Sequence, residues 1–354
     1  MKPDFNILHD AILNKPTSRI PLYEHIIDVE IMEEIMGKKF FDDTLSPQDN
    51  LIYFHKNSIG FWHQMGYDSY SFEVVPAFAE RHEIVTDDTA GTDRQTRGWV
   101  DENSGPIQEW ADLENEKYWP SDEESGDFAQ FEIIEKLLPE GMKLIGGFSG
   151  GPFEHATFLM GLEPFSVRLY EDPEFAKRLT DLIGERISYG AERISKMDCL
   201  GVYRFGDDLG YKTSTMISPA NLREYVFPWY KKIVGIAHKN NKPFLLHSCG
   251  NLADVMEDII SCGADAKHSF EDTIISVEEA RDRWGSEITL IGGIDVDFLC
   301  RASEAEINER VKRTMDYCSK SGGYVMGSGN SIANYVPVKS YLAMIKAAHE
   351  FNGA

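Results

Sequence analysis

The sequence contains few cysteines, few basic residues and no long apolar segment. Its five cysteines show neither the paired spacing of a disulfide framework nor a CxxC motif, which favours a reducing compartment. No apolar run approaches the ~20 residues of a membrane span, and the N-terminal residues lack the pattern of a secretory signal peptide. We therefore expect a cytoplasmic protein without a membrane segment.

Acidic residues outnumber basic ones by 59 to 35, which gives the chain a formal net charge of −24 at pH 7. A surface of this charge repels nucleic acids and anionic membranes, so neither is expected as a partner. The 354 residues, of which 42% are hydrophobic, suffice for one large domain. No linker interrupts the sequence, and we expect a single domain over residues 1–354.

Short apolar segments alternate with amphipathic helical segments along the chain. The expected strands lie near residues 20–27, 67–75, 143–149, 200–208, 242–249, 264–271, 288–295 and 323–330. This alternation predicts an α/β fold, a (β/α)8 TIM barrel. A doubly wound open sheet is the alternative, but the GxGxxG turn that would follow its first strand is absent. Residues 77–140 form a long insertion after the second strand, and its tryptophans favour an ordered excursion such as a lid.

Polar residues follow many of the expected strands. In a barrel of this kind, functional side chains gather at the carboxyl ends of the strands. Each of these residues also has a structural explanation, as a turn cap, a buried ion pair or a satisfied core histidine. Because they would all meet at one end of the barrel, we interpret them together as a site. They include Glu24, His25, Glu73, Ser149, Arg204, Asp207, Asp208, His247, Cys249, His268, Glu271, Asp295, Ser328 and Asn330.

His247 and Cys249 lie two residues apart at the end of the segment KPFLLHSCGN, residues 242–251. On an extended strand both side chains point to the same face. An imidazole and a thiolate that converge are half of a zinc site, and a catalytic zinc needs a third ligand from elsewhere. The alternative is a glycine-containing loop with a buried, inert thiol.

Several blocks of the sequence resemble the uroporphyrinogen decarboxylase superfamily, which includes the cobamide-dependent methyltransferases. The blocks are GFSGGPFEHATFLMG, SPANLREYVFPWYKKI, HSCGN, ITLIGGIDV and GYVMGSGNSIANYVP. The resemblance covers most of the chain, is strongest over residues 143–345, and implies a (β/α)8 barrel. True decarboxylases carry an arginine-rich N-terminal motif and an aspartate that ends the second strand. The corresponding segments here read YEHIID and YSFEVVPAF.

These departures favour the methyltransferase branch. That branch binds zinc through a His-x-Cys pair, matched here by His247 and Cys249, and through a more distant cysteine. Asn330 lies near the position of that cysteine and completes the implied metal set. Since asparagine is a weak zinc ligand, the site could recruit Asp208 or Glu73, bind metal loosely or have lost it.

The resemblance thus implies a zinc-dependent methyltransferase that moves a methyl group between a small substrate and the cobalt of a corrinoid. The corrinoid would be carried by a partner protein, the substrate could be a methoxylated aromatic, and a homodimer is a possible assembly. Candidate catalytic residues are His25, Asp208 and His268. Candidate substrate-binding residues are Glu73, Phe148, Phe153, His155, Arg204 and Asp207.

Two alternatives stay open at this point. One is a decarboxylase that acts without metal on a porphyrinogen or a smaller acid, with Arg204 holding a carboxylate and Asp207 or Asp208 stabilising a protonated pyrrole. The other is a non-catalytic barrel that binds a corrinoid or a partner protein.

Overall fold

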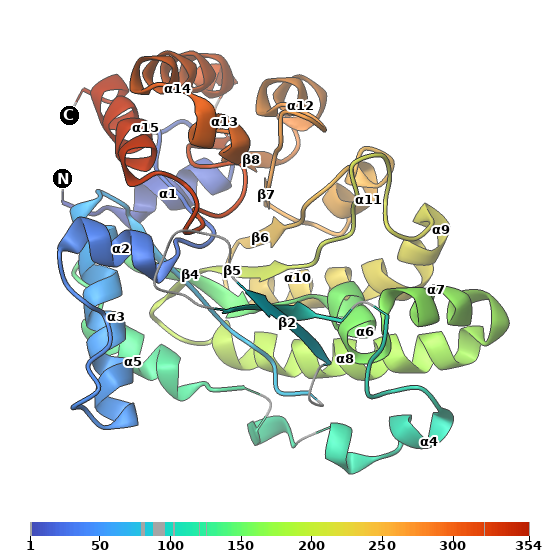
Figure 1. The fold of residues 1–354 in the computed structure, drawn as a ribbon. Coiled ribbons are helices and arrows are strands. Elements are labelled where there is room, and N and C mark those ends of the chain that lie inside the picture. The colour runs from blue at the N-terminus through green and yellow to red at the C-terminus, as the bar shows by residue number, and fades with distance from the viewer. Residues whose placement is uncertain are drawn as a thin grey trace.

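The computed structural model describes residues 2–78, 82–87, 96–101, 103–119, 121–124, 126–321 and 323–353. Its centre is a curled sheet of seven parallel strands in the order β1-β4-β5-β6-β7-β8-β9, shown in Figure 1. The strands are β1 (Ser69–Val74), β4 (Lys143–Phe148), β5 (Leu200–Gly206), β6 (Phe244–His247), β7 (Ala266–His268), β8 (Thr289–Ile291) and β9 (Tyr324–Val325).

Seven of the eight expected strands form the sheet, whereas the first expected strand, residues 20–27, is not a regular strand in the described structure. The segment makes single parallel bridges, Leu22 with Met326 and Ile27 with Ile332. One reason is Pro21, which has no N–H to contribute to a ladder.

This segment nevertheless contacts both edges of the sheet. The backbone N–H of Tyr23 donates to the carbonyl oxygen of Met326, next to β9, at 2.9 Å. The hydroxyl of Ser71 in β1 donates to the carbonyl oxygen of Glu24 at 2.7 Å. Residues 20–27 therefore lie between the two edge strands, and they bring the side chains of Glu24 and His25 to the end of the sheet.

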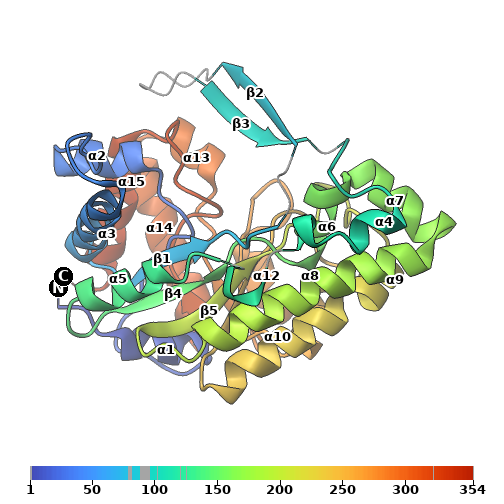
Figure 2. The same ribbon diagram turned by 90° about the horizontal axis from the view of Figure 1, so that it is seen from below.

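Most of the helices cover the outer face of the sheet, whereas α1 packs at one end of its inner face (Figures 1 and 2). The longest, α8, begins after Asp172, whose carboxylate accepts a hydrogen bond from the N–H of Phe175, and has Pro173 in its first turn. The helices are α1 (Phe5–Ile12), α2 (Val29–Met36), α3 (Pro47–Gln64), α4 (Trp110–Leu113), α5 (Ala129–Leu137), α6 (Pro152–Met160), α7 (Leu162–Glu171), α8 (Pro173–Ile194), α9 (Pro219–Asn221), α10 (Phe227–Lys239), α11 (Met256–Ser261), α12 (Val277–Trp284), α13 (Val296–Arg301), α14 (Glu304–Cys318) and α15 (Val338–Phe351). Within the described ranges, no helix combines the length and apolarity that a bilayer crossing requires.

The inner face of the sheet is apolar at one end and polar at the other. Its apolar end packs against α1 through a buried cluster of Leu8, Ala11, Ile12, Tyr23, Ile145, Val202, Leu245, Ala266, Ile291 and Val325. Residues two apart on a strand share a face. Arg204, His247 and His268 follow Val202, Leu245 and Ala266 at this spacing, so the same alternation that builds the cluster points these three side chains inward.

The expected excursion at residues 77–140 contains two different parts. Strands β2 (Glu83–Asp87) and β3 (Thr96–Val100) form an antiparallel hairpin that projects from the body beyond the end of β1, as Figure 2 shows. Helix α5, by contrast, belongs to the body because Phe131 and Ile134 are buried in the core. The role of the excursion as a lid stays a prediction.

We expect Gly184→Ala to destabilise the fold. A Cβ at Gly184 in α8 would lie 2.0 Å from the indole of Trp229 in α10, and such overpacking costs ~1–3 kcal/mol of unfolding free energy. Gly235→Ala is the control, because a Cβ at this exposed position in α10 meets nothing within 4 Å and should stabilise the helix by up to ~1 kcal/mol. Urea unfolding measures both. Equal midpoints for Gly184→Ala and the unchanged protein would contradict this packing.

Candidate functional site

The ends of β5 and β6 bring Asp208, His247 and Cys249 together. His247 Nε2 lies 3.5 Å from Cys249 Sγ and 3.9 Å from Asp208 Oδ1, and the potential ligand atoms of the three residues all lie within 4.8 Å of one another. Asp208 Oδ1 also accepts the backbone N–H of Cys249 at 2.8 Å. An imidazole, a thiol and a carboxylate thus face a common point, which is a combination of donors that suits zinc.

Asn330 contacts this group through its amide nitrogen. Asn330 Nδ2 lies 3.2 Å from Cys249 Sγ, and the hydroxyl of Ser269 lies 3.9 Å from the same sulfur. The amide therefore donates to the thiol sulfur, and this contact makes Asn330 a hydrogen-bonding neighbour of the site. Asp208 is the carboxylate that lies within reach of a shared ligand position with His247 and Cys249.

A chain of hydrogen bonds determines which nitrogen of His247 faces Cys249. The carbonyl oxygen of Ser328 can only accept, so His268 Nε2 must donate to it across 3.0 Å. Burial lowers the pKa of His268 to about 3, and the neutral ring has a lone pair on Nδ1. His247 Nδ1 lies 2.8 Å from His268 Nδ1 and donates to its lone pair. Burial also lowers the pKa of His247, so this ring is neutral too. Its Nε2 atom consequently carries a lone pair that faces Cys249 and Asp208.

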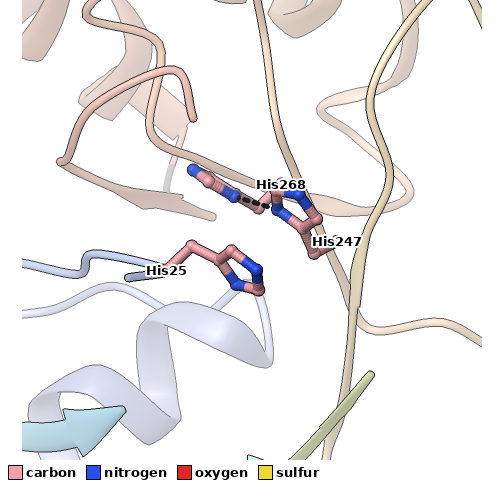
Figure 3. A group of neighbouring side chains, drawn as sticks. All are labelled: His25, His247 and His268. Carbon is pink, nitrogen blue, oxygen red and sulfur yellow. Dashed lines mark hydrogen bonds between the residues drawn. The ribbon is translucent and has the colours of Figure 1, made fainter. Parts of the chain in front are cut away.

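His25 covers the other side of His247. The two rings stack with centroids 3.7 Å apart and planes inclined by 3°, an arrangement visible in Figure 3. Burial lowers the pKa of His25, so the stacked rings are both neutral. His25, His247 and His268 form a second group with potential ligand atoms within 4.8 Å, but His247 and His268 already share a hydrogen bond there. The Asp208 side of His247 is therefore the better metal position.

Arg204 connects His25 to the sheet. Its side chain is buried; Nε donates to Glu73 Oε1 at 2.8 Å, and Nη1 donates to the hydroxyl of Tyr23 at 2.8 Å and to the carbonyl oxygen of His25 at 3.1 Å. Burial raises the pKa of Glu73, and the Arg204 charge opposes this shift. Glu73 and Arg204 thus neutralise each other inside the site.

The carboxylate of Asp207 binds the first turn of helix α6. Its carboxylate accepts the backbone N–H groups of Phe153 at 3.2 Å and Glu154 at 2.7 Å, and the hydroxyl of Tyr230 at 2.9 Å. These N–H groups belong to the first turn of α6, so Asp207 satisfies donors that the helix leaves unpaired. Burial raises the pKa of Asp207 to about 7 in spite of these bonds.

The expected aromatic substrate contacts are mostly core contacts. Phe148 is fully buried against Phe128, and Phe153 packs against Phe165, with ring centroids 5.7 and 6.3 Å apart. Neither lines the cavity beside His25, which corrects the pocket role expected for them. His155 lies in α6, with Nε2 2.9 Å from the carbonyl oxygen of Ser149.

The cavity beside His25 has a volume of about 230 Å³ and is lined largely by apolar side chains. Its aromatic wall comes from α3 and β1, which contribute Phe54, Trp62, Tyr70 and Phe72. Glu73 and Arg204 line it as an ion pair. The sequence did not lead us to predict that α3 lines a cavity. Its spacing could have done so, because Phe54, Ser58 and Trp62 recur every four residues and thus share one helix face.

Residues 105–351 match the family model described as uroporphyrinogen decarboxylase (URO-D). A uroporphyrinogen decarboxylase from Geobacter sulfurreducens is 23% identical over 263 residues, which cover 70% of this chain and 72% of that protein. One from Citrifermentans bemidjiense is 26% identical over 234 residues, which cover 62% of this chain and 63% of that protein. A solved methyltransferase from Methanosarcina mazei shares the fold, with a TM-score of 0.72, 18% identity and 99% coverage of both chains.

We expect Arg204→Met to lower the free energy of unfolding by ~3–5 kcal/mol, because it leaves Glu73 buried without a counter-charge. The double variant Glu73→Gln/Arg204→Met should recover part of this loss. Arg223→Met is the control: Arg223 pairs with Asp258 at 2.8 Å on the surface, where an ion pair contributes ~0–1 kcal/mol. Chemical unfolding of the variants measures these differences, and equal losses for Arg204→Met and Arg223→Met would contradict the described burial.

Proposed function

The chain belongs to the uroporphyrinogen decarboxylase (URO-D) family, and we propose that it is a zinc-dependent methyltransferase. It would move a methyl group between a small substrate and the cobalt of a corrinoid carried by a separate protein. The observation that carries the proposal is the convergence of Asp208, His247 and Cys249 on one point. We further propose that residues 20–27 close the sheet into one barrel domain over residues 1–354, with this site at its mouth.

The donor set agrees with zinc in its chemistry. It offers one imidazole nitrogen with a lone pair, one thiol and one carboxylate, all of them ligand types that zinc uses. When bound, zinc would supply Lewis acidity to an ether oxygen or lower the pKa of a thiol substrate. The protein's own contribution is to hold the ligands: His268 fixes the tautomer of His247, and Asn330 donates to the Cys249 sulfur.

The cavity supports a small, uncharged substrate. Its volume of about 230 Å³ lies below the ~300–1,000 Å³ of pockets for drug-sized ligands. Its aromatic wall suits a planar ring, and a methoxylated aromatic is the substrate that we favour. His25 lies between the cavity and His247, where its neutral imidazole is the candidate to accept a proton from the substrate.

Decarboxylation is the second candidate, favoured by the names of the curated relatives. It would need a cation that holds a substrate carboxylate. Arg204 is the cation that lines the described cavity, but it donates to Glu73, Tyr23 and His25. A tetrapyrrole with several carboxylates is also larger than this cavity. Both observations count against the decarboxylase.

We expect the purified protein to bind about one zinc ion per chain and to form methylcobalamin from a methoxylated aromatic and reduced cobalamin. His247→Ala and Cys249→Ser should lose both zinc and activity, because each removes one of three ligands. Cys300→Ser is the control, since its thiol lies 4.0 Å from the carbonyl oxygen of Tyr335, outside the site. Metal analysis and the absorbance of methylcobalamin are the measurements.

The same variants, assayed also with uroporphyrinogen and with a corrinoid protein, separate the methyltransferase from the decarboxylase and from a non-catalytic barrel. Full activity and no bound metal in His247→Ala would contradict the zinc site. Turnover of uroporphyrinogen would establish the decarboxylase instead. Binding of a corrinoid protein without turnover and without metal would establish a non-catalytic barrel.

A further prediction concerns His268 as a positioning residue. His268→Leu removes the acceptor for His247 Nδ1–H and should weaken zinc binding ~10–100-fold. His268→Gln should recover part of the affinity, because its amide can accept from His247 and donate to Ser328. Competition with a chelator measures the affinity of each variant. Identical losses in both variants would mean that the ring fills space and does not orient His247.

A further inference from the structure

Lys267 in β7 is a buried cation next to the candidate metal site, and its charge acts on Cys249 and Asp208. Its side chain is 2% exposed, its ammonium donates to the carbonyl oxygen of Ser269, and it lies 4.2 Å from the ring centroid of Phe270. No carboxylate of the described residues lies within 4.0 Å of this nitrogen in an ion pair. Burial lowers the pKa of Lys267 to about 8, so the group is still largely charged at pH 7. The charges of Cys249, Asp208 and Glu271 oppose this shift of the pKa, but a buried ammonium that has no carboxylate in contact is still costly.

A small cavity lies beside this lysine, separate from the aromatic cavity next to His25. Its volume is about 60 Å³ and its wall includes Lys267, Phe270, Met256, Trp284 and the loop 250–253. One water needs only ~10–15 Å³ of such space, so several non-hydrogen atoms can enter. The described lining contains no aspartate or glutamate.

A second cation stands at this cavity. Arg283 belongs to its lining, has a half-exposed side chain, and lies 3.6 Å from Glu279 Oε1. The exposure of Arg283 places it on the solvent side, whereas Lys267 is buried. The lining thus holds two basic side chains, of which Arg283 is paired with Glu279, and otherwise mainly apolar ones.

We propose that this cavity binds a small carboxylate, of the size of formate or acetate, with the Lys267 ammonium as its counter-charge. An ammonium has three N–H donors, and the carbonyl oxygen of Ser269 takes one of them. The apolar wall suits a short alkyl group and excludes highly hydrated ions. The loop 250–253 follows Cys249 directly, so a bound carboxylate would also hold the segment after the thiol. This site does not depend on the reaction proposed above.

Thermal unfolding at constant ionic strength tests the site with formate, acetate, propionate and butyrate. We expect a saturable rise in Tm with formate or acetate that shrinks with longer chains. Lys267→Met should abolish this rise and, without any carboxylate, should itself raise Tm because it removes an uncompensated buried charge. Lys232→Met is the matched control: its ammonium lies 4.6 Å from the ring centroid of Trp229 but the residue is exposed, so the rise should persist.

Three results would overturn the site. They are an equal rise with every salt including chloride, a carboxylate-dependent rise that persists in Lys267→Met, and a fall in Tm of that variant in carboxylate-free buffer. Calorimetric titration of the unchanged protein with acetate decides the question if the variant does not fold. Saturable heat supports the site, and its absence up to high acetate concentration overturns it.

Discussion

The site depends on one hydrogen-bond chain that starts at a backbone carbonyl. Because the oxygen of Ser328 can only accept, His268 must donate to it and must accept from His247. This sequence of donors leaves a lone pair on His247 Nε2, facing the thiol of Cys249 and the carboxylate of Asp208. With the opposite tautomer His247 would present an N–H there, and the three residues could not share a metal ion.

Alternation along the strands explains what could be predicted from the sequence. His247 follows Leu245 and His268 follows Ala266 by two residues, so the apolar pattern that identifies each strand also states which polar side chain points inward. The same argument could not place Phe148 and Phe153. Phe148 ends β4 and Phe153 lies in the first turn of α6, and their burial against Phe128 and Phe165 depends on how the neighbouring helices pack.

Contacts between distant segments account for the rest. Pro21 interrupts the pairing of the first expected strand, but what remains still brings His25 onto the ring of His247. The sequence predicts Asp207 as a site residue, but in the structure its carboxylate accepts hydrogen bonds from the first turn of α6. The role of Arg204 depends on Glu73, which lies 131 positions earlier in the chain. The local sequence pattern does not indicate which of these distant residues a polar side chain will contact.

The packing of helix α1 at the apolar end of the sheet limits how molecules can reach the site. Leu8, Ala11 and Ile12 pack against the inner side chains of the strands, and the carbonyl oxygen of Ala11 accepts from the hydroxyl of Thr289 at 2.9 Å. This end of the sheet is therefore filled by side chains, and it offers no path to the polar end. In the methyl transfer proposed above, the small substrate and the corrinoid protein would then both approach the site from the polar end of the sheet. The small substrate would therefore have to enter before the corrinoid protein covers that entrance.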